Sequence, residues 1–119
     1  MNRELEMAKL ACRALDEKKG KDIKVIDIHE VSVIADYFVI ASASNQNQVQ
    51  AMVDNVDETL GRAGFEAKQI EGTRNSSWVL MDYGDMIVHV FDEENRLFSD
   101  LERIWRDGKV LDVNEFLEK

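Results

Sequence analysis

The sequence contains little cysteine and little histidine, and this scarcity excludes two kinds of chemistry. The single cysteine, Cys12, cannot form a disulfide within the chain, and its helical spacing with Leu5 and Leu15 predicts a buried structural thiol. His29 and His89 are the only histidines, and no C-x-x-C or H-x-x-x-H pair is present to start a zinc site. A G-x-S-x-G motif is also missing. Neither a metal centre nor a serine hydrolase is therefore expected.

Positive charge is scarce as well. The chain has 15 Lys and Arg against 24 Asp and Glu, which gives a formal net charge of −9. Binding to a phosphate backbone is driven by Lys and Arg that release counterions, so direct, sequence-specific binding of nucleic acid is not expected. An acidic surface is instead compatible with a basic protein partner.

Long hydrophobic runs are absent, and the apolar segments are far too short to cross a bilayer. Residues 1–6 become charged at once, which is not typical of a secretory signal. The 119 residues, 45% of them hydrophobic, suffice for one core and not for two. We therefore expect a single domain over residues 1–119, in the cytoplasm and without membrane attachment.

Hydrophobic periodicity predicts the order of helices and strands. The expected elements are a helix over 2–18, strands over 22–28 and 37–41, a helix that follows Asn45 and ends at Gly64, an edge strand over 65–71, a hairpin over 77–92, a helix over 97–106 and a short helix within 112–119. The unbroken apolar run 37–41 is typical of a central strand. This order predicts an α/β fold with a mixed five-stranded sheet and helices mainly on one face.

The hairpin is the most informative segment, because both of its faces are rich in apolar side chains. With Gly84 and Asp85 as the central residues of a tight turn, the cross-strand pairs follow directly. One face carries the pairs Tyr83–Met86, Met81–Val88 and Val79–Val90, and the second face carries Asp82–Ile87, Leu80–His89 and Trp78–Phe91. The first face is apolar throughout and is expected to be buried in the core.

The second face of the hairpin has two interpretations. Aromatic and apolar residues mixed with a few polar groups are typical of an exposed protein-binding surface. A central strand covered on both faces would show the same apolar pattern. The small number of helices, which cover one face, favours the binding surface.

Two polar segments are candidates for an anion-binding site or a metal site. Residues 42–44 lead into a helix and could bind an anion through free backbone N–H groups, but Ala43 stands where a phosphate-binding turn usually needs glycine, so the interpretation of Ser44 and Asn45 as helix caps is preferred. Asp82 and Asp85 are three residues apart across a turn, so they are expected to stabilise the turn and not to hold metal ions. His89 is expected to be a contact residue or a partly buried histidine and not a general base.

Four segments together resemble one known family. These are D-Y-F-V-I-A-S-A-S at 36–44, E-G at 71–72, W-V-L-M-D-Y-G-D-M-I-V-H-V-F at 78–91 and R-L-F-S-D-L-E-R-I-W at 96–105. They resemble the ribosomal silencing factor, or Iojap-related, family over nearly the whole chain. The resemblance implies a nucleotidyltransferase-like domain without the catalytic carboxylates.

The resemblance also implies a function and a set of contacts. It implies a translation repressor that binds the large ribosomal subunit through ribosomal protein L-fourteen and sterically blocks joining of the small subunit. No cofactor is implied. The residues carried over as partner contacts are Trp78, Leu80, Asp82, His89, Phe91, Arg96 and Phe98, with Trp78 as the apolar anchor and Asp82 as a charge partner for Lys or Arg.

Two other functions stay open at this stage. One is a nucleotide-binding or nucleotidyltransferase-like enzyme that uses Ser44, Asp82 and Asp85. The other is self-association as a homodimer through the second face of the hairpin, because an exposed apolar patch serves either use.

Overall fold

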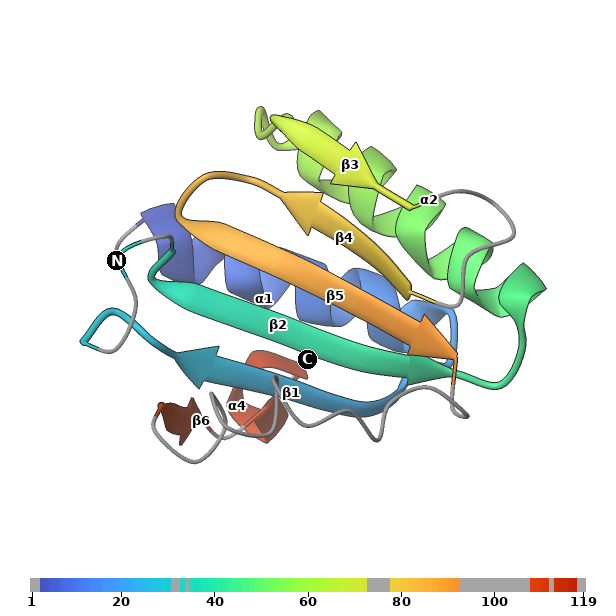
Figure 1. Cartoon of the computed structure of the whole chain (residues 1–119), viewed down its shortest axis with the longest axis horizontal. Helices are drawn as coiled ribbons and strands as arrows, with labels where there is room; N and C mark the ends of the chain where they lie inside the picture. Colours follow the sequence, from blue (N-terminus) through green and yellow to red (C-terminus); the bar gives the residue numbers. More distant parts are fainter. Residues whose placement is uncertain are drawn as a thin grey trace.

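The computed structural model describes residues 3–30, 33, 35–72, 78–92, 108–111 and 113–117. Within these ranges six strands form one sheet in the order β3-β4-β5-β2-β1-β6 (Figure 1). The strands are β1 (Lys21–Asp27), β2 (Tyr37–Ala43), β3 (Gln69–Glu71), β4 (Trp78–Asp82), β5 (Met86–Asp92) and β6 (Lys109–Leu111). Only β2 and β5 pair in parallel within this sheet, so it is mixed, as the sequence predicted.

The prediction of five strands was wrong, because β6 adds a sixth. This strand has three residues and pairs with β1 through Val25 opposite Leu111 and Asp27 opposite Lys109. So short a segment shows no alternation of apolar and polar residues that would indicate a strand. The predicted edge strand is confirmed as β3, with later bounds, and the helix predicted over 97–106 lies outside the described residues.

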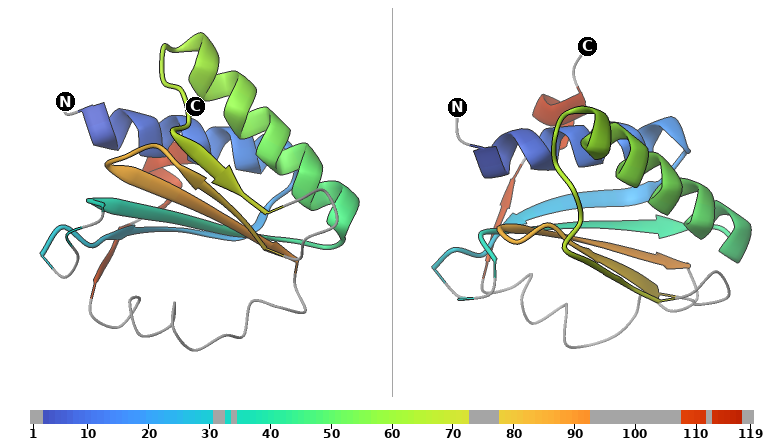
Figure 2. Two further views of the ribbon diagram at one scale, coloured as in Figure 1. Left: turned by 45° about the horizontal axis from the view of Figure 1, so that its top comes forward. Right: turned by 90° about the horizontal axis from the view of Figure 1, so that it is seen from above.

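The helices lie on one face of the sheet, as predicted (Figure 2). They are α1 (Arg3–Glu17), α2 (Gln46–Arg62) and the short α4 (Val113–Leu117). Apolar side chains of α1 and α2 pack with those of the strands in the main core. No helix in the described part of the chain is long and apolar enough to span a membrane.

Cys12 lies in this main core and is fully buried on α1. Burial, with a smaller effect from the carboxylate of Asp16, raises the pKa of its thiol to about 12. A thiol with so high a pKa forms almost no reactive thiolate at neutral pH. The predicted structural role of Cys12 is confirmed.

A second, smaller apolar cluster covers the opposite face of the sheet. Its buried members are Ile26, Ile28, Ala35, Phe38, Ile40, Ile87 and Phe91, with Leu80 packed against them. They come from four neighbouring strands and the link before β2. The central strands therefore separate two apolar clusters, one on each face.

The hairpin of β4 and β5 has the register that the sequence predicted. Trp78 lies opposite Phe91, Leu80 opposite His89, and Asp82 opposite Ile87. Gly84 has a φ of +90°, and its N–H donates to the carboxylate of Asp82 across 2.7 Å. The glycine thus permits the turn and Asp82 stabilises it, as predicted.

We expect Tyr83→Phe to leave the protein equally stable or to stabilise it by up to about 1 kcal/mol. The phenol oxygen of Tyr83 is buried and has no hydrogen-bond partner within the described ranges, and burial together with Asp57 raises the pKa of the phenol. Removal of an unsatisfied polar group recovers its desolvation penalty, whereas the ring and its packing remain. Urea unfolding measures the change.

Met81→Ala is the matched control, because Met81 is a fully buried neighbour on the same strand face. Its loss leaves a cavity and is expected to lower the free energy of unfolding by roughly 2–5 kcal/mol. A loss of more than about 1 kcal/mol in Tyr83→Phe would mean that the hydroxyl is hydrogen-bonded in solution.

Candidate partner-binding surface

Three of the predicted contact residues lie on one face of β4 and reach solvent. Trp78 is 47% exposed, and Leu80 and Asp82 are partly exposed, whereas Val79 and Met81 between them are buried. The alternation follows from the strand's position, because the described helices α1, α2 and α4 lie on the other face. β4 therefore presents an aromatic, an aliphatic and an acidic side chain in a row.

His89 and Phe91, two other predicted partner contacts, are buried in this structure. Each is only 3% exposed. β5 lies between β4 and β2, so side chains of both neighbours pack around these two rings. The Phe91 ring stacks on that of Trp78 at a centroid distance of 5.4 Å, and the Phe38 ring meets the His89 imidazole edge-on at 4.6 Å. For β5 the alternative of a strand covered on both faces holds.

Arg96 and Phe98, the remaining predicted contacts, lie outside the described residues.

Strand β3 adds two polar residues that the sequence reasoning missed. Gln69 pairs with Asp82, and Glu71 pairs with Leu80, so their side chains share the outer face of β4. The amide of Gln69 donates to the carboxylate of Glu71 across 3.0 Å. The only signal in the sequence is the E-G pair at 71–72, which belongs to the family resemblance but does not by itself indicate a role for Glu71. We call Gln69, Glu71, Trp78, Leu80 and Asp82 the β3–β4 surface.

Two carboxylates of the β3–β4 surface lie beside its two apolar side chains, Trp78 and Leu80. Glu71 is exposed beside Leu80, and Asp82 lies two residues further along β4. Lys68 is also near, with its side chain over Gly84 of the turn. The arrangement is an apolar centre with a charged rim, which is the usual anatomy of a protein-binding surface.

Gly72 fixes β3 against the start of β4. Its φ is +106°, and a Cβ built there would lie 2.7 Å from the backbone oxygen of Trp78. Any other residue would be strained and would push against backbone that cannot move aside. The close approach of these two segments therefore requires glycine.

His89 is linked to the exposed indole by a hydrogen bond. The Nε1–H of Trp78 donates to Nδ1 of His89 across 3.2 Å. Nε2 of the same imidazole is buried and has no hydrogen-bond partner among the described residues. Burial lowers the pKa of His89 to about 4, so the imidazole is neutral at physiological pH.

The turn before α2 is a helix cap, as the preferred interpretation held. The N–H of Gln48 donates to the side chain of Asn45 across 2.8 Å, and the N–H of Ser44 donates to the side chain of Gln48 across 2.6 Å. Gln48 also donates to the backbone oxygens of Lys18 and Lys19, which ties this turn to the end of α1. The N–H groups of Ser44 and Gln48 are thus already used by side chains of the turn itself.

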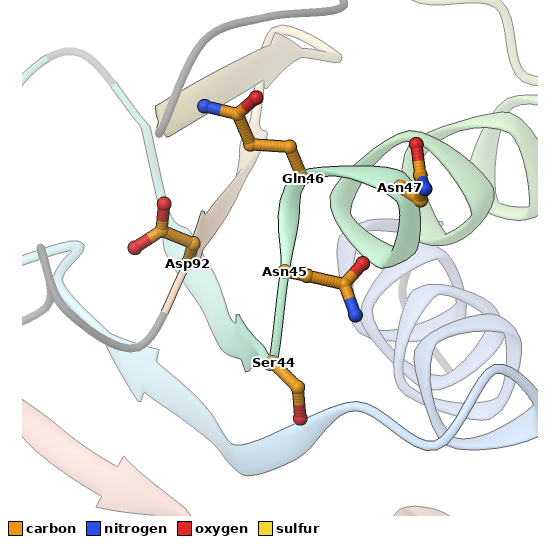
Figure 3. A pocket seen from close by; sticks show the side chains of 5 residues that line it. All are labelled: Ser44, Asn45, Gln46, Asn47 and Asp92. Atoms are coloured by element: carbon orange, nitrogen blue, oxygen red, sulfur yellow. The ribbon is translucent and has the colours of Figure 1, made fainter.

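A polar hollow of about 430 Å³ lies beside this turn and is lined by Ser44, Asn45, Gln46, Asn47 and Asp92. Figure 3 shows the carboxylate of Asp92 and the amide of Asn45 pointing away from each other. The negative charge of Asp92 would also repel a phosphate. The hollow is therefore poorly suited to a nucleotide.

The residues of the rival enzyme hypothesis are not brought together. Asp85 lies at the start of β2, where its backbone oxygen accepts from the N–H groups of Asp36 and Tyr37. Ser44 follows the other end of that strand, roughly 20 Å away at about 3.3 Å per residue. Across the described ranges, no group of three or more His, Cys, Asp or Glu side chains could hold a metal ion.

A second hollow, of about 280 Å³, lies near the start of β2 and is lined by Asp27, His29, Asp36 and Tyr37. The imidazole of His29 is hydrogen-bonded to the carboxylate of Asp27, which raises the pKa of the histidine. His29 itself is exposed, so this pair is screened by water.

Comparison with known proteins gives a consistent result. A family model described as "Ribosomal silencing factor during starvation" matches residues 1–119. The chain is 36% identical over 106 residues to the ribosomal silencing factor RsfS of Bacillus subtilis, a match that covers 89% of this chain and 90% of that protein. It is 39% identical over 106 residues to RsfS of Zymomonas mobilis, with 89% and 80% covered. A crystal structure of a protein from Chromobacterium violaceum superposes with a TM-score of 0.82 at 34% identity, covering 88% of each chain.

We expect Gly72→Ala to destabilise the protein by roughly 1–3 kcal/mol, because a Cβ is strained at this φ and collides with the backbone of Trp78. Thermal and urea unfolding measure the loss. Trp78 fluorescence, recorded in a Trp105→Phe background, should also shift as the start of β4 is displaced.

Gly61→Ala is the matched control. Gly61 lies in the last turn of α2, where a Cβ would meet nothing within 4 Å. Alanine favours the helix, so this variant is expected to gain up to about 1 kcal/mol. Equal stability of the two variants would contradict the requirement for glycine at position 72.

Proposed function

Because the chain belongs to the ribosomal silencing factor family, we propose that it represses translation by binding the large ribosomal subunit through ribosomal protein L-fourteen. In this proposal the bound protein sterically blocks joining of the small subunit. Its site of action is the cytoplasm, where the subunits meet. We also propose that the domain, for which the family resemblance implies a nucleotidyltransferase-like architecture, acts as a scaffold without catalysis.

The single observation that carries this proposal is the exposure of Trp78. A tryptophan that is 47% exposed, beside a partly exposed leucine, forms an apolar patch that a partner can cover. Tryptophan is also the residue type most enriched among binding hot spots. The β3–β4 surface is therefore the proposed docking surface.

Charge complementarity supports a basic partner. The chain carries a net charge of −9, and Glu71 and Asp82 lie at the rim of the apolar pair. Ribosomal proteins that bind RNA are basic, so opposite charges would steer the encounter and raise its rate. Binding is accordingly expected to weaken as salt is raised.

Co-sedimentation tests the function. The purified protein is mixed with isolated large or small ribosomal subunits at moderate salt, and the missing subunit is then added. Sedimentation with the large subunit alone, together with fewer joined ribosomes, is the expected result. Binding to the small subunit alone, or unchanged joining, would contradict the proposal, and a free protein that sediments as a dimer would direct attention to self-association.

We expect Trp78→Ala to weaken binding to the large subunit by about 2 kcal/mol or more, roughly thirtyfold, with the fold intact. The indole is the largest exposed apolar group of the β3–β4 surface, so its removal takes away the proposed anchor. Titration of labelled protein against large subunits measures the dissociation constant, and circular dichroism checks the fold.

Val110→Ala is the matched control. Val110 is 53% exposed on β6, which forms the opposite edge of the sheet. Its removal is expected to leave the dissociation constant unchanged. Equal effects of the two substitutions would show that the β3–β4 surface is not the docking surface.

A further inference from the structure

His89 is a polar residue in an apolar place. Its strand neighbours across the sheet are Leu80 on β4 and Ile40 on β2. Aromatic rings of Phe38, Trp78 and Phe91 surround its imidazole at centroid distances between 4.6 and 6.2 Å. None of these described neighbours carries a charge, so phenylalanine would suit the packing better.

The imidazole is poorly satisfied at this place. Nδ1 accepts a hydrogen bond from the indole, so the proton of the neutral ring is on Nε2. That Nε2–H is buried, and the part of the chain that the structure describes gives it no hydrogen-bond partner. A buried donor without a partner opposes folding, so the packing of the second face does not explain this histidine.

The one described hydrogen bond of the imidazole is accepted from Trp78, whose orientation packing alone does not fix. Trp78 is half-exposed, and its ring lies on Phe91 with an angle of 18° between the planes. Stacking fixes the plane of an indole but allows it to flip or slide within that plane. The hydrogen bond from Nε1 to His89 selects one edge of the ring and therefore one orientation.

We propose that His89 is a positioning residue, which holds the half-exposed indole of Trp78 in one orientation ready for a protein partner. The proposal rests on the proposed function, in which Trp78 is the anchor. His89 does not touch the partner and acts only through the indole. Preorganisation of an anchor reduces the ordering that binding must otherwise impose, so loss of the histidine weakens binding.

The protonation state suits this role. Desolvation lowers the pKa of His89 to about 4, so Nδ1 remains an acceptor at every physiological pH. The unfolded chain binds a proton to this histidine near pH 6.5, which is above the folded pKa. His89 therefore lowers the stability of the protein as the pH falls from about 6.5 toward 4.

His89→Phe tests the proposal, because it keeps the ring and removes the acceptor. We expect this variant to unfold at the same temperature as the wild type or higher, yet to bind large ribosomal subunits about three- to tenfold more weakly. Its advantage in unfolding temperature should grow between pH 8 and pH 5. Other titrating groups, including His29, are present in both proteins and cancel in the difference.

His89→Asn is the matched variant, because its amide oxygen lies near the place of Nδ1. The smaller side chain leaves a cavity, so His89→Asn is expected to be less stable than His89→Phe. It is nevertheless expected to bind the large subunit more tightly than His89→Phe does. The double variant Trp78→Ala with His89→Phe should bind no more weakly than Trp78→Ala alone, since the histidine acts through the indole. Three results would overturn the proposal: losses of affinity that add up in the double variant, wild-type affinity for the large subunit in His89→Phe, or weaker binding by His89→Asn than by His89→Phe.

Spectroscopy separates this proposal from the proposed function. The indole Nε1–H resonance of Trp78, assigned with Trp105→Phe, should show slowed exchange and a hydrogen-bonded shift in the wild type and lose both in His89→Phe. An indole resonance that is the same in the two proteins would overturn the positioning role without any ribosome present. A wild-type protein with this signature that fails to bind the large subunit would overturn the proposed function alone.

Discussion

The parallel pairing of β2 with β5 at the centre of the sheet determines which side chains of this protein can reach a partner. Seven residue pairs, from Tyr37 opposite Met86 to Ala43 opposite Asp92, join the two strands along their whole length. Each of the two strands has another strand on its outer side, so neither has a free edge. Their residues are buried on both faces nearly throughout. Exposed apolar side chains consequently lie on strands nearer the edges of the sheet. On β4, one face is in contact with solvent.

β4 is the boundary between core and surface, and this explains its mixed character. The helices cover its inner face, where Val79 and Met81 pack in the main core. Its outer face begins with Trp78, whose ring covers part of Phe91 and leaves the rest of the indole in water. Trp78 thus stacks on a member of the second apolar cluster and also forms part of the surface. A partner that covered it would extend an existing apolar cluster and would not need to create a new one.

Features set by a few neighbouring residues were predictable from the sequence, and features set by strand order were not. Gly84 fixed the hairpin register, and Asn45 with Gln48 marked the start of α2, because turns and caps depend on local chemistry. The burial of His89 depends on which strands flank β5, and periodicity along one strand does not encode that. Glu71 was missed for a similar reason, since its place beside Leu80 follows from the register of β3 against β4.

The position of His89 has a bearing on how stability and binding are balanced in so small a domain. An unsatisfied buried donor costs about 1–3 kcal/mol, which is a large part of the roughly 5–15 kcal/mol that separates folded from unfolded states. Ordering one mobile side chain during binding costs about 0.5–1.5 kcal/mol. The two amounts are similar, so a histidine that destabilises the free protein can be retained when it orders an anchor before the partner arrives. In the proposed role, the imidazole carries its proton on Nε2 and accepts the indole hydrogen bond at Nδ1. This one tautomer both orders the indole and leaves the Nε2–H unsatisfied.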